Sequence, residues 1–474
     1  MPRRRRGHAG DDDEVAVARF RPHKMYPGAL LAQEVCSYQA MTQLLMEMQG
    51  SLAVLIHSDR DCSNVIQKTG RGNGLHPEWD RRFFCTNLKE HELVAGQGNA
   101  KLRRAIDVVE QAVAPELLVV LSTCPTVMIG DNMKNVARKA GRDLGRDVVA
   151  QVTHGLRPKS PAEVLDDCYS LLCRGARRTR EDVERRVNLV GIGMNPAEEA
   201  ELREGLGALG LEVNVVLNER SELSAFRAVP DARFNIHPGP HMLEAFDGQC
   251  QKDFSMTAIE VPLPIGVAAT DRFFATVARA VGIDESGPAT LSPRRDAAVA
   301  AVASFRERTA AGRLRLGYNI GSVRSFDLRR IALEETGELP LFEELGFAIH
   351  LYIQGPADAD NVARTAGVLG ELGIAHPFTI FRDPGGLGRV LGPGQLDLFF
   401  GVDFLRLELE RVSAPLLDQH EVRLGYDGAV RSIDAMAAHL GATFYRQFAE
   451  IAGRIVGGLA TDDSDVARPA PAPR

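Results

Sequence analysis

The fold is decided by two stretches of sequence, CSYQAMTQLLMEMQGSLAVLIHSDRDC (residues 36–62) and PELLVVLSTCPTVMIGDN (residues 115–132). Each contains a short apolar run, Leu52–Ile56 in the first and Leu117–Leu121 in the second, with polar residues directly after it. Apolar runs of this length between turn signals are typical of strands buried in a parallel sheet. We therefore predict neighbouring parallel strands with helices between them.

Three cysteines lie at the start or just past the end of a predicted helix or strand. Cys36 opens a predicted helix, Cys62 lies in a polar turn after the first strand, and Cys124 follows the second strand. Loops at the carboxyl ends of parallel strands line one crevice, so we expect the three thiols to meet there. The sequence shows no sign of secretion, so such thiols are better interpreted as soft metal ligands than as disulfide partners. Iron–sulfur clusters are the cofactors that several thiolates from separate loops usually bind.

Composition places the chain among ordinary globular proteins. At 474 residues it is too long for one core, and its 45% hydrophobic and 25% charged residues are unexceptional. The net charge of −7 argues against a nucleic-acid-binding protein, which would need a basic surface. No apolar run is long enough for a membrane helix. MPRRRRGHAGDDDE at the start has no apolar segment behind it and is not a signal peptide. We therefore expect a cytoplasmic protein.

The seven cysteines have no compact spacing. No CxxC is present, which argues against a zinc ribbon or a ferredoxin-type loop. Cys168 and Cys173 lie in an apolar stretch near helical spacing, so we expect both to be buried as small hydrophobic residues.

We predict an α/β protein of three Rossmann-like domains with parallel sheets, because strand and helix patterns alternate along the chain. The cluster cysteines fall in the first domain, and a helix close to Ser292–Ala310 links the second domain to the third. The predicted segments are a disordered arm (1–25), three α/β domains (26–185, 186–310 and 311–458, the last with a C-terminal helix) and a disordered tail (459–474).

Four segments resemble the component 1 subunits of nitrogenases and nitrogenase-like reductases. The cysteine contexts at Cys36, Cys62 and Cys124 are similar to the family's, as are CTNLKEHELVAGQGNAKLRRAI (85–106) and STCPTVMIGDNMKNVARK (122–139). The likeness runs over about residues 28 to 456. It implies the family's three-domain fold, and it implies that the three cysteines hold this subunit's half of a P-type cluster, [4Fe–4S] or [8Fe–7S].

The likeness is closer to the β-type chains. α-Type subunits anchor a catalytic metal cofactor with a middle-domain cysteine and a last-domain histidine, but DARFNIHPGPHMLEAF (231–246) has no cysteine at the matching place. Cys250 and His420 are the nearest substitutes, outside the family context. Cys85 departs from the family pattern; it is either a fourth ligand or a buried thiol.

The resemblance also implies partners. A homologous α-type subunit would complete the cluster in a heterodimer or α2β2 heterotetramer and could carry a larger iron–sulfur cofactor. An ATP-dependent iron protein would donate electrons transiently, because the chain has no GxxxxGK[ST] motif of its own.

The substrate is left open by the sequence. We favour reductive cleavage of a methylthio-alkane C–S bond, since the departures at the cofactor site argue against a plain dinitrogen enzyme. A non-catalytic scaffold for assembly of the nitrogenase cofactor and a subunit of dinitrogen-reducing nitrogenase are the alternatives. A purely structural α/β protein remains only if the three cysteines do not converge.

Overall fold

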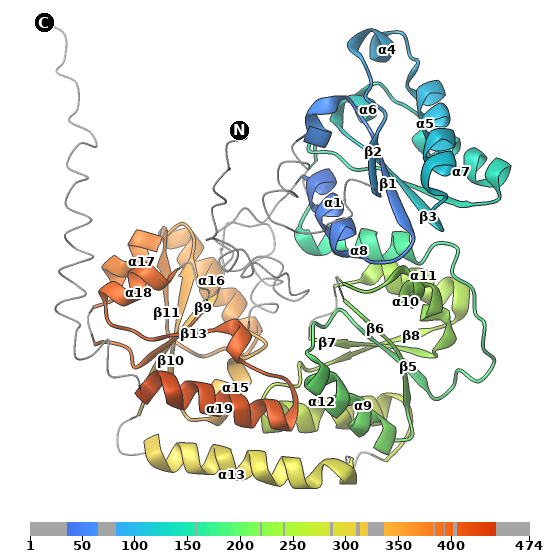
Figure 1. Cartoon of the computed structure of the whole chain (residues 1–474). Coiled ribbons are helices and arrows are strands. Elements are labelled where there is room, and N and C mark those ends of the chain that lie inside the picture. Colours follow the sequence, from blue (N-terminus) through green and yellow to red (C-terminus); the bar gives the residue numbers. More distant parts are fainter. Residues whose placement is uncertain are drawn as a thin grey trace, which may run out of the picture.

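Three parallel β-sheets, each flanked by helices, make up the described part of the chain (Figure 1). The computed structural model describes residues 36–64, 82–157, 159–218, 220–239, 242–284, 288–309, 313–320, 336–382, 384–392, 394–401 and 405–441. None of the helices in these ranges is long and apolar enough to cross a membrane.

The first unit contains the three cysteines. Its sheet has the order β2-β1-β3-β4, and all its strands are parallel. Side chains alternate between two cores: Ala53 and Leu55 of β1 face α5 and α7, whereas Val54 and Ile56 face α1 and α8. The elements are α1 (Ser37–Glu47), β1 (Leu52–His57), β2 (Phe83–Cys85), α4 (Glu90–Val94), α5 (Gly98–Val113), β3 (Leu117–Ser122), α6 (Cys124–Met128), α7 (Met133–Leu144), β4 (Asp147–Gln151) and α8 (Pro161–Leu172).

The second unit repeats this plan with the strand order β6-β5-β7-β8. Its first helix, α9, begins at a well-formed cap, since the Asn195 side chain accepts from the backbone N–H groups of Ala197 and Glu198. The elements are β5 (Arg186–Val190), α9 (Pro196–Ala208), β6 (Glu212–Leu217), α10 (Leu223–Ala228), β7 (Phe234–Pro238), α11 (Glu244–Phe254), β8 (Thr257–Val261) and α12 (Val267–Ala280).

The third unit has five strands in the order β11-β10-β9-β12-β13, and α13 (Ser292–Thr309) leads into it. Its long last helix packs beside α13 at the base of the molecule (Figure 1). The elements are β9 (Arg315–Ile320), α15 (Leu339–Glu344), β10 (Ala348–Gln354), α16 (Ala359–Glu371), β11 (Phe378–Phe381), α17 (Pro384–Val390), β12 (Leu398–Gly401), α18 (Arg406–Arg411), β13 (Leu416–Asp418) and α19 (Gly425–Gly441).

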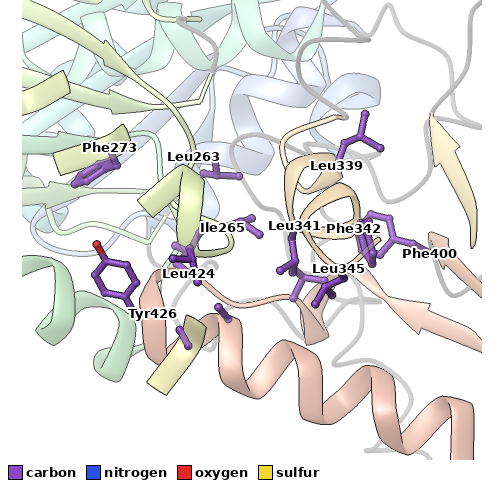
Figure 2. Close-up of a cluster of buried hydrophobic side chains, with 14 of the residues drawn as sticks. Leu263, Ile265, Phe273, Leu339, Leu341, Phe342, Leu345, Phe400, Leu424 and Tyr426 are labelled. Carbon is purple, nitrogen blue, oxygen red and sulfur yellow. The ribbon is translucent and has the colours of Figure 1, made fainter. Parts of the chain in front are cut away.

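The second and third units share one hydrophobic core. Figure 2 shows Leu263 and Ile265 of the second unit in the same cluster as Leu341 and Phe342 of α15. The backbone continues the contact, because the N–H of Gly425 donates to the carbonyl of Pro264 at 2.8 Å. These two units are therefore one packed body.

Carboxylates from one unit also cap helices of another. Glu344 of α15 accepts from the N–H groups of Val267 (2.9 Å) and Ala268 (3.3 Å) at the start of α12. Asp166 of α8 does the same for Ala245 and Phe246 in the first turn of α11, both at 2.8 Å. Each cap satisfies N–H groups that a helix leaves open at its start.

The predicted α/β class with parallel sheets and three Rossmann-like units is confirmed. Each sheet falls within one of the ranges 26–185, 186–310 and 311–458, while those boundaries stay a prediction. The arm over residues 1–25 and the tail over residues 459–474 lie outside the described residues. Cys168 and Cys173 are buried, as expected.

Candidate iron–sulfur site

Cys62 lies in a helical turn directly after β1. The carboxylate of Asp59 accepts from the N–H of Asp61 (2.9 Å), and Ser63 Oγ donates to the carbonyl of Arg60 (2.9 Å), which closes the turn. From α1, the hydroxyl of Tyr38 donates to the Cys62 carbonyl at 3.2 Å. The position of Cys62 is thus fixed from both its own loop and a neighbouring helix.

Cys124 is the first residue of α6, which begins two residues after β3. Thr123 is the N-cap, and its backbone N–H donates to Thr126 Oγ1 at 3.1 Å. The thiol accepts a hydrogen bond from the backbone N–H of Gly155 (Gly155 N–Cys124 Sγ, 3.2 Å), in the loop after β4. A backbone N–H directed at sulfur is a common feature of cluster ligands, whose potential it tunes.

Cys36 is the N-cap of α1, as the sequence predicted for the start of a helix. Its neighbour Ser37 donates through Oγ to the carbonyl of His154 (2.9 Å) and accepts from the His154 N–H (3.0 Å). This pair of bonds ties the start of α1 to the same loop that holds Gly155.

Two of the three thiols, those of Cys36 and Cys124, lie beside Gly155. A side chain at Gly155 would place its Cβ 3.4 Å from Cys36 Sγ and 3.8 Å from Cys124 Sγ, so only glycine leaves the space between them open. Cys62 is close enough for the charges of Cys124 and Cys36 to act on its thiol. All three residues are partly exposed and none is in a disulfide.

Burial is the main reason why the pKa of Cys62 rises to about 11, and the nearby charges of Asp59, Cys124 and Cys36 add to it. The thiol is therefore protonated at neutral pH in the metal-free protein. Thiols bind metal as thiolates, so metal binding here would release a proton.

Among the described residues, no group of three or more His, Cys, Asp or Glu side chains converges tightly enough to hold one metal ion. Ligands of a single zinc ion must lie within about 4 Å of each other, since each Zn–S bond is about 2.3 Å. Cluster ligands bind different iron atoms and are spaced more widely. Thiol donors and a backbone N–H directed at sulfur are features found in protein sites that hold iron–sulfur clusters.

Cys85 lies at the end of β2, next to the Cys62 loop. Its thiol donates to the carbonyl of Asp59 (3.2 Å) and accepts from the N–H of Asn87 (3.3 Å), and burial raises its pKa. These bonds give it a definite role in holding the loop; a role as a ligand stays a prediction.

The other two candidate ligands lie elsewhere. Cys250 of α11 is 1% exposed and packs near Cys173 in the core between the first and second units. His420 lies between β13 and α19 in the third unit, well away from α1 and α6 (Figure 1). The structure does not bring His420 to the three cysteines.

The sequence interpretation overlooked His57, Asp131 and Gly155. His57 is fully buried at the end of β1, and its Nε2 lies 3.0 Å from Asp131 Oδ2. A histidine at the end of an apolar run, five residues before the candidate ligand Cys62, was the available signal. Gly155 could not be recognised from the local sequence, because its importance comes from residues 31 and 119 positions away.

Apolar side chains are exposed on the segments that contain Cys124 and Gly155. Met128 is 73% and Ile129 42% exposed at the end of α6, and Leu156 is 57% exposed next to Gly155. Exposed apolar groups around a polar site are typical of surfaces that another protein covers.

A separate cavity of about 550 Å³ lies where the second unit meets the third. It is at the carboxyl ends of β7 and β8, with charged groups from Glu260 and Arg272. Its lining residues are Gly239, Glu260, Val261, Pro262, Leu263, Ala269, Arg272, Thr336, Gly337 and Pro340.

Known proteins match the chain in both sequence and fold. It is 30% identical over 138 residues to the nitrogenase molybdenum-iron protein alpha chain of Methanosarcina barkeri, covering 28% of this chain and 26% of that protein. It is 33% identical over 124 residues to the nitrogenase iron-molybdenum cofactor biosynthesis protein NifE of Rhizobium meliloti (strain 1021), covering 26% and 25%. It is 26% identical over 170 residues to a subunit of the light-independent protochlorophyllide reductase of Acaryochloris marina, covering 33% of each.

These matches therefore span a quarter to a third of the relatives' lengths. In fold, the structure described as "Nitrogenase Cp1 at pH 6.5" superposes with a TM-score of 0.64 at 14% identity, covering 94% of this chain and 96% of that one. A family model described as Nitrogenase component 1 type Oxidoreductase matches residues 36–321, which is more than half of the chain. The chain belongs to the nitrogenase component 1 type oxidoreductase family.

Proposed function

We propose that this chain is a subunit of a nitrogenase-like reductase complex and that Cys36, Cys62 and Cys124 hold its share of a P-type iron–sulfur cluster. The observation that supports the proposal is that Cys36 Sγ and Cys124 Sγ lie beside Gly155, while the charges of both sulfurs act on the thiol of Cys62. Members of the family generally bind iron–sulfur clusters, which agrees with this donor set.

When bound, such a cluster supplies one-electron transfer. The chain's own residues would set its surroundings. The Gly155 N–H is directed at the Cys124 sulfur, Tyr38 and Asp59 fix the Cys62 loop, and the apolar strands β1 and β3 keep water from the buried side.

Three thiolates from one chain leave a cluster incompletely ligated, so a partner must supply the rest. The exposed apolar groups of Met128, Ile129 and Leu156 support a partner covering this face. The proposed partner is a homologous α-type subunit in a heterodimer or α2β2 heterotetramer, with an ATP-dependent iron protein as electron donor. A larger iron–sulfur cofactor would then lie on the α-type partner.

For the substrate, we propose reductive C–S cleavage of a methylthio-alkane by a complex in which this chain is the β-type subunit. Support comes from the middle unit, where residues 231–246 contain no cysteine to anchor a catalytic cofactor. The relatives include a nitrogenase alpha chain as well as a protochlorophyllide reductase subunit, so they do not decide between the two chain types.

The second candidate is a scaffold for assembly of the nitrogenase cofactor. It is favoured by the match to NifE at 33% identity, and the same three cysteines would serve it. The match to a molybdenum-iron protein alpha chain supports the further alternative, a dinitrogen-reducing nitrogenase. Reduction of a methylthio-alkane, release of an assembled cofactor to an acceptor protein, and reduction of dinitrogen are the three activities that separate these candidates.

The test is anaerobic co-purification with the partner subunit, followed by iron analysis and EPR. We expect Cys62→Ala to lower bound iron about tenfold, because one ligand is lost, with the fold retained. Cys168→Ala is the matched control, since it removes a fully buried thiol from the core of the same unit. Iron content that is the same in wild type and Cys62→Ala would contradict the proposal.

A further inference from the structure

His57 lies at the point where the cysteine-bearing loops meet. It is the last residue of β1, is fully buried and stands opposite Ser122 of β3 in the sheet. The loop to Cys62 begins directly after it, and α6 with Cys124 begins directly after Ser122 and Thr123. Any shift of His57 would therefore move both loops.

His57 is bonded to both of its neighbouring segments. Its Nε2 lies 3.0 Å from Asp131 Oδ2, and its carbonyl accepts from Thr126 Oγ1 at 3.1 Å, so it contacts the start of α6 and the segment after it. Its Nδ1 lies 3.3 Å from Thr86 Oγ1, which follows Cys85 and also bonds Ser58. One imidazole thus joins the segments that carry Cys62, Cys85 and Cys124.

Asp131 is held in turn by the start of α5. A side chain at Gly98, the first residue of α5, would collide with the Asp131 carboxylate, so the carboxylate packs directly against this glycine. The positive end of a sixteen-residue helix stabilises a carboxylate there. Burial lowers the pKa of His57, and the contact with Asp131 opposes this shift.

We propose that His57 and Asp131 are a positioning pair that fixes the distance between the Cys62 and Cys124 loops before the cluster binds. This inference rests on the proposed function and adds to it a device within the chain. The two residues do not contact the thiols; they act through Ser58, Thr86 and Thr126.

The first test uses the metal-free full-length protein. Dibromobimane joins two thiols that are close together, and mass spectrometry identifies the Cys62–Cys124 product. We expect His57→Leu to slow this cross-link about tenfold relative to labelling by monobromobimane, because the loops lose their common anchor. His57→Gln, which retains a donor toward Asp131, should restore most of the rate.

Gly98→Ala is the second variant, since it displaces the flexible Asp131 side chain without changing His57. We expect the same slower cross-link. His237→Leu is the matched control, because His237 and Asp247 form another buried pair (2.7 Å) in the second unit. It should lower thermal stability and leave the cross-link unchanged.

The second test is made on the anaerobic complex with the partner. His57→Leu should lose iron to a chelator about tenfold faster and shift the midpoint potential, while His237→Leu should do neither. If His57→Leu lowers stability like His237→Leu but leaves cross-linking and iron loss unchanged, the positioning role is wrong. If wild type itself binds no iron, the proposed function fails, and the cross-link alone decides the positioning role.

Discussion

Gly155 shows how one residue can decide whether the site is open. Its backbone N–H bonds the Cys124 sulfur, and the absence of a side chain leaves the space between Cys36 and Cys124 free. Its backbone is not in the left-handed region, so the need for glycine comes from space alone.

Gly155→Ala should therefore lose iron without losing the fold. The new methyl group would make only ordinary contacts at 3.4 and 3.8 Å, so the free energy of unfolding should change by less than about 0.5 kcal/mol. Bound iron per complex, measured beside urea unfolding of the metal-free chain, checks this. Gly207→Ala in α9, where nothing lies within 4 Å, is the control that should retain iron. Full iron content in Gly155→Ala would contradict the arrangement.

Cys62 should be unreactive at neutral pH in the metal-free chain. With its pKa at about 11, the thiolate is on the order of one part in a thousand at pH 8, against about a quarter for a free thiol of pKa about 8.5. Alkylation by iodoacetamide should rise about tenfold for each pH unit from 8 to 10. Site-resolved mass spectrometry, with the urea-unfolded chain as reference, measures this; equal rates in both states would contradict it.

The same shift has a consequence for stability. The folded chain keeps the Cys62 proton above the pH at which the unfolded chain loses it, so the unfolded state binds fewer protons there. Stability of the metal-free chain should therefore fall as pH rises through about 8.5.

At the residue scale, the sequence indicated which cysteines are candidate ligands, but it did not indicate the residues that hold them in position. Each of Cys36, Cys62 and Cys124 follows a recognisable strand or opens a helix, and strand ends meet in one crevice. His57, Asp131 and Gly155 matter because of partners at least 29 residues away, and no local pattern reports such contacts.

Helices and strands were predicted where their local signal is strong. The apolar run Leu52–Ile56 is β1, Leu52–His57, and the run Leu117–Leu121 is β3, Leu117–Ser122. The edge strand β4 was missed because Asp147–Gln151 is short and only partly apolar. Helix α8 was also missed, although Ser160, Pro161 and Glu163 form a capping box that signals its start.

The caps between units are a feature of elements that sequence does not reveal. Glu344 and the α12 start that it caps are 77 residues apart. Gly266, directly before α12, has φ +87°, and a Cβ there would meet Glu344 Oε2 at 2.8 Å. The glycine and the carboxylate therefore depend on each other.

Glu344→Ala should destabilise the protein by about 1 kcal/mol, the usual cost of a lost helix cap. Urea unfolding measures the total, and faster hydrogen exchange at Val267 and Ala268 locates the effect. Glu343→Ala is the control, since Glu343 is exposed and bonds His376 at 2.8 Å, a pair that contributes little. Losses of equal size in the two variants would argue against the cap.

For the whole molecule, the alternation of strands and helices predicted three units in series, and the sheets follow that order. Sequence did not predict how the units associate. The first unit has a core of its own between β1 and helices α5 and α7, whereas its other face shares a core with the second unit, and the second unit shares another with the third. That difference depends on which surfaces meet, and apolar periodicity is the same in either case.

The shared core limits how the cavity at Arg272 and Thr336 could admit a molecule. A hinge motion requires an interface between the two units that can separate. Here that interface contains the packed cluster of Leu263, Leu341 and Phe342. Opening the two units like a clamshell would expose that cluster to water. A molecule that enters the cavity would therefore pass between the side chains at its opening, while the second and third units stay packed against each other.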